Sequence, residues 1–178
     1  TINGVLIGII LSFTEIIIRT SKPNRCFLGI QPGHKHFRNL NSTSAVHPIS
    51  GVVIYKFSSN LFFANIDVMM QDIEAHIKED TKAVILDASG IGNIDITAAD
   101  KLSMLYKNLK AKDIRFYMTE HIADVNNQLR RLGLSYMIEE GRVRRTIHIA
   151  LKDMGINRPY PLENGVDNEQ LSASRRRA

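Results

Sequence analysis

Residues 82–105 read KAVILDASGIGNIDITAADKLSML, and this stretch decides the fold of the chain. Residues 82–86 form an apolar run that ends in Asp87, which is typical of a central strand buried on both faces. Farther along, apolar residues recur at three- and four-residue spacing over 98–111, which predicts an amphipathic helix. Asp95 and Thr97 are the two candidates to cap that helix. A strand, a loop and a helix in this order indicate an α/β fold.

Strands and helices alternate outward from this unit. Short runs rich in β-branched and aromatic residues predict strands, and apolar residues at helical spacing predict helices. A polar connector with Pro32, Gly33 and Pro48 follows the first strand, so we expect a long irregular loop there. Asn65 and Gly133 are in the positions of an N-cap and a C-cap. The expected strands are 27–31, 51–57 and 114–118, with a short strand at 61–63 left open, and the expected helices are 66–79, 122–132 and 146–154.

The N-terminal stretch carries no charge over residues 1–14, and its first acidic residue is Glu15. It is too short for a complete membrane span, which needs about 20 apolar residues, so we expect residues 1–20 to be the end of such a span or a juxtamembrane stub. Basic residues follow it, beginning with Arg19 and Lys22, which places the rest of the chain on the cytoplasmic side if the stretch lies in a membrane. The alternative is a buried helix or strand of a soluble domain.

The length of 178 residues and the apolar content of 44% fit one folded domain, which we expect over 21–155, followed by a polar C-terminal tail over 156–178. The net charge of +5 is distributed as +4 over residues 1–50, −3 over 51–141 and +4 over 142–178. The basic excess therefore lies in the flanks. With no Trp and only 7% aromatic residues, the chain also offers few stacking surfaces, and we expect no nucleic-acid partner.

No motif for catalysis or for a bound metal stands out. Gly90 and Gly92 follow a strand, but the Gly-Lys-Ser/Thr of a phosphate-binding loop and the third glycine of a dinucleotide fingerprint are missing, which favours a plain flexible turn. The six histidines are scattered, and the single cysteine, Cys26, forms neither an internal disulfide nor a thiolate zinc site. No nucleophile and base pairing supports hydrolase chemistry. We therefore expect no enzyme activity, no metal and no cofactor.

The loop after the central strand is the candidate regulatory or interaction site. In open α/β sheets the carboxyl ends of the strands carry the functional loops, although carboxylates there are equally explained as caps and loop hydrogen-bonders. We expect the loop backbone to be accessible around residues 90–93 and its polar side chains to lack a full set of internal partners. The helix N-terminus at 96–97 also offers N–H groups for weak anion binding, including a nucleotide phosphate. The candidate residues are Asp87, Ser89, Gly90, Asn93, Asp95 and Thr97.

Four stretches resemble the STAS domain at the carboxyl terminus of SulP-type anion transporters. Residues 27–41, FLGIQPGHKHFRNLN, resemble the family's first strand and connector, and 51–65, GVVIYKFSSNLFFAN, resembles the segment that follows, with a close match at LFFAN. Residues 84–102, VILDASGIGNIDITAADKL, are similar to the family's strand–loop–helix junction. Residues 132–154, LGLSYMIEEGRVRRTIHIALKDM, resemble its last loop and helix. The resemblance covers roughly residues 25–154.

The resemblance implies a STAS-like mixed sheet of about four to five strands with about four helices mainly on one face. It further implies a non-catalytic regulatory and interaction domain of a SulP-type secondary transporter for sulfate or a related small anion. Such a domain lies on the cytoplasmic face of the cell membrane as part of an integral membrane protein. Its partner is the membrane domain of the same transporter, with a homodimer, a cytoplasmic protein partner and weak nucleotide binding left open. Nothing in the residues chooses the anion.

The alternative is a free-standing anti-sigma-factor antagonist that acts by partner switching. In that class an Asp-Ser-Ser/Thr-Gly motif is phosphorylated on its first serine, whereas this chain reads Asp95-Ile96-Thr97-Ala98. Ile96 has no hydroxyl to accept a phosphate, which argues against the alternative. Thr97 matches the second hydroxyl position, so phosphorylation there or at Ser89 is left open.

Overall fold

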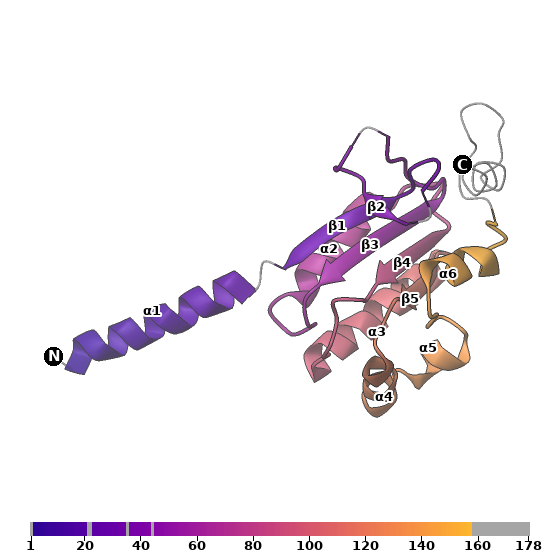
Figure 1. Ribbon diagram of the computed structural model, residues 1–178. Coiled ribbons are helices and arrows are strands. Elements are labelled where there is room, and N and C mark those ends of the chain that lie inside the picture. Colours follow the sequence, from indigo (N-terminus) through magenta and orange to yellow (C-terminus); the bar gives the residue numbers. More distant parts are fainter. Residues whose placement is uncertain (1, 21–22, 35, 44, 158–178) are drawn as a thin grey trace.

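The computed structural model describes residues 2–20, 23–34, 36–43 and 45–157. Figure 1 shows a sheet flanked by helices, with one further helix, α1 (Ile2–Thr20), extending away from the sheet on its own. From residue 158 onward, the expected C-terminal tail lies outside the described residues.

Five strands form one mixed sheet: β1 (Asn24–Gly29), β2 (Arg38–Asn39), β3 (Val52–Ser58), β4 (Ala83–Asp87) and β5 (Arg115–Thr119). Their order across the sheet is β2-β1-β3-β4-β5. β3, β4 and β5 run parallel, and β1 is antiparallel to both of its neighbours. All residues of β4 are buried, and the strand lies between two parallel neighbours, which confirms the prediction from its apolar run.

The helices of the domain are α2 (Ile66–His76), α3 (Ile96–Ala111), α4 (Ala123–Arg131), α5 (Ser135–Glu139) and α6 (Ile147–Asp153). Successive side chains of a strand point to opposite faces of a sheet. On one face Tyr55, Leu86 and Phe116 belong to the larger core, which α2, α3, α4 and α5 complete. On the other face Ile54 and Ile85 pack with α6. The helices thus lie mainly on one face, as expected, and the helix expected at 146–154 is the exception.

Several boundaries differ from those expected from the sequence. β1 begins at Asn24 rather than at residue 27, because β3 pairs with the strand along its first five residues. The expected irregular connector contains β2, whose two residues are both exposed and therefore leave no apolar pattern. The sequence also gives no sign of α5, because five residues are too few for a helical periodicity. The stretch 61–63 forms only a single bridge, from Leu61 to Ile94.

Helix α1 leaves its side chains outside the core. All residues over 2–17 are exposed, including Ile2 at 82% and Phe13 at 63%. This exposure contradicts the alternative of a buried element of a soluble domain. The backbone hydrogen bonds of an α-helix form within the helix, apart from those of its end groups, so α1 does not require a strand partner for them. Among the described helices, α1 included, none has the length and apolar character required to cross a bilayer.

Candidate interaction site at the carboxyl edge of the sheet

The segments that follow β3, β4 and β5 meet at one edge of the sheet, because the three strands run parallel. We call residues 59–67, 88–100 and 120–124 the carboxyl edge. The first two segments are joined directly, since the Leu61 N–H donates to the Asn93 carbonyl at 2.9 Å. The candidate loop is therefore paired with the segment that precedes α2.

Two amide side chains hold the candidate loop in place. The Oδ1 atom of Asn60 accepts from the backbone N–H groups of Gly92 and Asn93, at 3.0 and 2.9 Å. Gln128, on α4, accepts from the Ile94 N–H at 2.9 Å and donates to the Gly92 carbonyl at 2.9 Å. These bonds satisfy backbone groups that the sheet does not reach. The loop is thus an organised structure rather than the plain flexible turn that its glycines favour.

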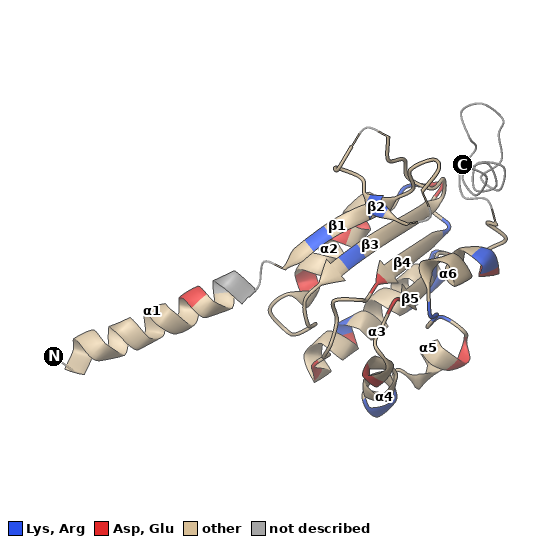
Figure 2. Cartoon of the chain, viewed as in Figure 1, with Lys and Arg blue, Asp and Glu red and all other residues tan. Residues whose placement is uncertain are grey.

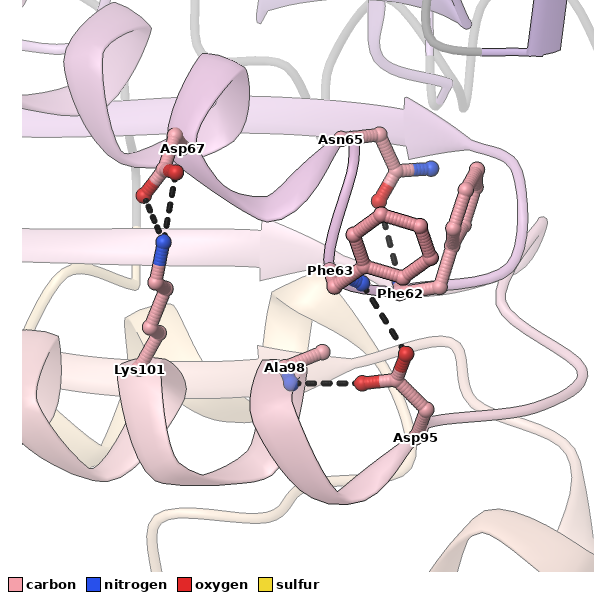
Figure 3. Close-up of polar contacts among 7 residues, drawn as sticks. All are labelled: Phe62, Phe63, Asn65, Asp67, Asp95, Ala98 and Lys101. Atoms are coloured by element: carbon pink, nitrogen blue, oxygen red, sulfur yellow. Dashed lines mark hydrogen bonds and ion pairs between the residues drawn. The ribbon is translucent and has the colours of Figure 1, made fainter. Parts of the chain in front are cut away.

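Asp95 joins the start of α3 to the segment before α2 (Figure 3). Its Oδ1 atom accepts from the Ala98 N–H at 2.6 Å, so Asp95, rather than Thr97, is the N-cap of α3. Its Oδ2 atom accepts from the Phe63 N–H at 2.9 Å. A carboxylate in this position already provides the negative charge that the N-terminus of a helix favours. It therefore opposes the weak anion binding left open at 96–97.

Asn65 and an ion pair fix the turn into α2, as Figure 3 shows. Asn65 occupies the N-cap position of α2 as expected, but its side chain makes no capping bond. Instead its Oδ1 atom accepts from the Phe62 N–H at 3.0 Å, and its Nδ2 atom donates to the Asn60 carbonyl at 2.8 Å. Because Asn65 is fully buried, these bonds offset the cost of removing its amide from water. Lys101 of α3 donates to Asp67 of α2 at 2.6 Å.

Asp87 and Ser89 lie beside a hollow on the α6 side of the sheet, and Figure 2 shows the charged residues of this region. The buried Asp87 carboxylate accepts from the Ser89 N–H at 3.0 Å and lies 3.3 Å from the Nζ atom of Lys56. Lys56 also donates to the Ser89 Oγ atom at 2.9 Å. These residues line a hollow of about 490 Å³ together with Cys26 and His148. Burial raises the pKa of the Cys26 thiol against the opposing charge of Lys56, so the thiol stays protonated at neutral pH and is a poor nucleophile.

Gly90 and Thr97 are exposed members of the candidate set. A Cβ atom on residue 90 would lie 2.5 Å from the Cα atom of Ser58, so the loop can approach the end of β3 only with glycine here. Of the stretch 90–93, which was expected to be accessible, Gly90 and Asn93 are exposed, whereas Ile91 is fully buried. Among the polar side chains of the loop, those of Asp87 and Asp95 have internal partners, because both carboxylates accept backbone N–H groups.

The candidate residues are divided between two places rather than gathered into one reactive cluster. Asp95 and Thr97 lie at the start of α3, whereas Asp87 and Ser89 lie beside the hollow. Among these candidates, the Ser89 hydroxyl accepts from Lys56, whose Nζ atom also lies 3.3 Å from the Asp87 carboxylate. Within the described ranges, His, Cys, Asp and Glu side chains do not gather in threes or more as a metal site requires.

Asn60 and Gln128, the two residues that hold the loop, were not among the residues expected from the sequence. Gln128 had one visible signal, since it is a polar residue beside Leu129 and three positions after Val125, on the face of α4 that turns inward. Asn60 had none, because its partners are 32 and 33 residues away in sequence. A side chain that bonds to a distant backbone leaves no periodic pattern.

A model of the STAS domain family matches residues 44–150, which is more than half of the chain. The chain therefore belongs to the STAS domain family. More particularly, it is related to the carboxyl-terminal domains of SulP and solute carrier 26 sulfate transporters. Sulfate transporter 4.1, chloroplastic, of Arabidopsis thaliana is 25% identical over 189 aligned positions, which cover 97% of this chain and 27% of the relative. The chain spans about a quarter of the length of the curated relatives it matches.

Solved structures show the same fold. The murine solute carrier 26 family member A9 anion transporter, in its inward-facing state, matches with a TM-score of 0.76 and 23% identity, over 87% of this chain and 26% of that one. A sulfate transporter family protein from Wolinella succinogenes matches with a TM-score of 0.55 and 24% identity, over 67% of this chain and 98% of that one. At these identities the likeness concerns the fold.

Proposed function

We propose that this chain is the cytoplasmic regulatory and interaction domain of a SulP-type secondary anion transporter. The observation that carries the proposal is the alignment with a sulfate transporter over 97% of the chain, which extends well beyond the STAS match at 44–150. In the proposal α1 is the end of the transporter's membrane region or a juxtamembrane stub. Its exposed apolar side chains support this role, because they have no place in the core of the domain.

The domain itself is non-catalytic in this proposal. The Asp87 carboxylate is buried, the Asp95 carboxylate caps α3, and each accepts a backbone N–H group. Burial keeps the Cys26 thiol protonated. The membrane region carries the anion, which is sulfate or a related small anion. The domain acts on transport through the surface it presents to that region, at the inner face of the cell membrane.

The exposed start of α3 supports this role over partner switching. Ile96 is 71% exposed at the position where an anti-sigma-factor antagonist carries its phosphoacceptor serine. An exposed position without a hydroxyl leaves a kinase nothing to modify there. Nucleotide binding is not part of the proposal, because the Asp95 carboxylate stands at the same helix terminus.

Uptake of labelled sulfate by the full-length protein that contains this chain tests the proposal. We expect uptake above that of cells carrying an empty vector, and competition by other small anions if one of them is the preferred substrate. Asn60→Ala removes two of the four bonds that hold the loop and should change the rate at equal membrane abundance, whereas Ile149→Ala, at an exposed site on α6, should not. Absence of uptake of every small anion tried would contradict the proposal, and an unchanged rate in Asn60→Ala would contradict the regulatory role.

A further inference from the structure

Exposed apolar side chains of the domain gather at the carboxyl edge. Outside α1, five large apolar side chains of the described residues are at least 40% exposed: Phe63, Ile96, Met104, Ile122 and Ile149. Three of them follow the carboxyl ends of the three parallel strands, one after each strand, with exposures of 59% at Phe63, 71% at Ile96 and 47% at Ile122. A single exposed apolar residue is ordinary on a protein surface. Three at one edge of a sheet suggest an interaction surface.

The charged residues of the carboxyl edge are all acidic. The segments 59–67, 88–100 and 120–124 contain five Asp or Glu residues and no Lys or Arg. Lys56 and Lys101, which lie outside these segments, are bonded to them, Lys56 to Ser89 and Lys101 to Asp67. An acidic and apolar surface is repelled by the anionic headgroups of a cytoplasmic leaflet. It complements a basic protein surface, because opposite charges steer and orient association.

The chain connects to α1 at this edge as well. Asn24, the first residue of β1, pairs with Ser58, the last residue of β3. In Figure 1, α1 accordingly approaches the sheet from the side where β1 begins. Three residues separate Thr20 from Asn24, and a chain of that length spans at most about 14 Å. Whatever surrounds the end of α1 therefore lies close to the carboxyl edge.

We propose that the carboxyl edge, with Phe63, Ile96 and Ile122 as its apolar contacts, docks on the cytoplasmic loops of the membrane region of its own polypeptide. The inference rests on the proposed function, which places α1 at the end of that region. Short cytoplasmic loops of membrane proteins are rich in Lys and Arg, so they supply the charge that the edge lacks. The apolar side chains then form the desolvated centre of the contact, and the carboxylates form its rim.

Photo-crosslinking in the full-length protein in its membrane tests this inference. A photoreactive phenylalanine analogue is placed at position 63 or 96, and matched controls carry it at 104 or 149, which are exposed apolar positions away from the edge. We expect positions 63 and 96 to crosslink to peptides of the membrane region, and positions 104 and 149 not to do so. The crosslinks should weaken in high salt, because the charged rim is solvent-accessible.

Crosslinks from all four positions alike, adducts to lipid alone, or no crosslink from 63 and 96 would each overturn the inference. Sulfate uptake by the same protein separates this result from the proposed function. Sulfate uptake without selective crosslinks would contradict the proposed docking surface but not the proposed transporter role. Recovery of the full-length protein outside the membrane fraction would contradict both the docking surface and the transporter role.

Discussion

The Asp95 carboxylate performs two structural tasks with its two oxygen atoms. It caps α3 through the Ala98 N–H and holds the segment before α2 through the Phe63 N–H. We predict that Asp95→Ala lowers the free energy of unfolding by about 1–2 kcal/mol, the usual cost of losing a helix cap. Chemical denaturation of the chain measures this.

Two controls separate the cap from the charge. Asparagine is as good an N-cap as aspartate, so Asp95→Asn should retain most of the stability. Thr97→Ala changes an exposed residue of the same helical turn and should alter the free energy of unfolding by less than about 0.5 kcal/mol. Equal losses in Asp95→Ala and Thr97→Ala would show that the cap contributes nothing.

Gly90 is required by a close approach of two backbone segments. A Cβ atom there would lie 2.5 Å from the Ser58 Cα atom, and backbone cannot yield as a flexible side chain does. We predict that Gly90→Ala destabilises the chain by about 1–3 kcal/mol, the range for an overpacked site. Thermal melting measures the loss, with the exposed Ser89→Ala as its neighbour for comparison. A melting temperature of Gly90→Ala equal to that of Ser89→Ala would contradict the tight approach.

At the scale of elements, the apolar sequence pattern predicted those strands and helices whose formation depends on burying apolar side chains. β4 and α3 follow directly from the pattern of 82–105, because a strand buried on both faces and an amphipathic helix each leave a clear sequence pattern. β2 and α5 leave no such pattern, because β2 consists of two exposed residues and α5 of only five residues. The loop follows β4 as the sequence predicts, but its fixation by Asn60 and Gln128 depends on contacts between residues more than 30 positions apart, which no local pattern records.

The end of α5 is tied to α3 by a pH-dependent cluster. Glu140 accepts from the Lys110 Nζ at 2.8 Å and from the Tyr106 hydroxyl at 2.6 Å, and these two bonds hold the pKa of the Glu140 carboxyl below its usual range. Burial and the bond to Glu140 in turn raise the pKa of Tyr106 to about 12. A carboxyl with a lowered pKa in the folded state contributes stability above its unfolded pKa and loses it as the pH falls through the folded value.

We therefore predict that Glu140→Gln is less stable than the unmodified chain at pH 7, by under about 1 kcal/mol because the cluster is accessible to solvent. The difference should shrink as the pH falls below about 4.3, where the unmodified carboxyl also becomes protonated. Denaturation curves over a series of pH values measure this. A difference that stays constant down to about pH 2, well below the ordinary carboxyl range, would mean that the charge of Glu140 plays no part.

At the scale of the whole molecule, the stability of the sheet domain does not depend on α1. Since the apolar side chains of α1 are exposed, deletion of residues 1–20 removes little burial. We predict that this deletion leaves the melting temperature within about 2 °C and improves solubility. Deletion of residues 1–28 also removes most of β1 and is the control, because it takes away the buried Leu28 and should lower the melting temperature by several degrees. A large fall in melting temperature after the shorter deletion would mean that α1 packs into the core of the domain.

The position of the domain at the membrane is the central claim, and thiol labelling from one side measures it most directly. Met104 is exposed on α3 away from the carboxyl edge, so the full-length protein is prepared with Met104→Cys as its only cysteine, every other cysteine, Cys26 included, being replaced by serine. We predict that this protein remains in membranes washed with alkaline carbonate. We also predict that an impermeant maleimide labels the thiol introduced at position 104 in inside-out vesicles but not in intact cells. Labelling in intact cells, or release of the protein by the carbonate wash, would contradict this placement.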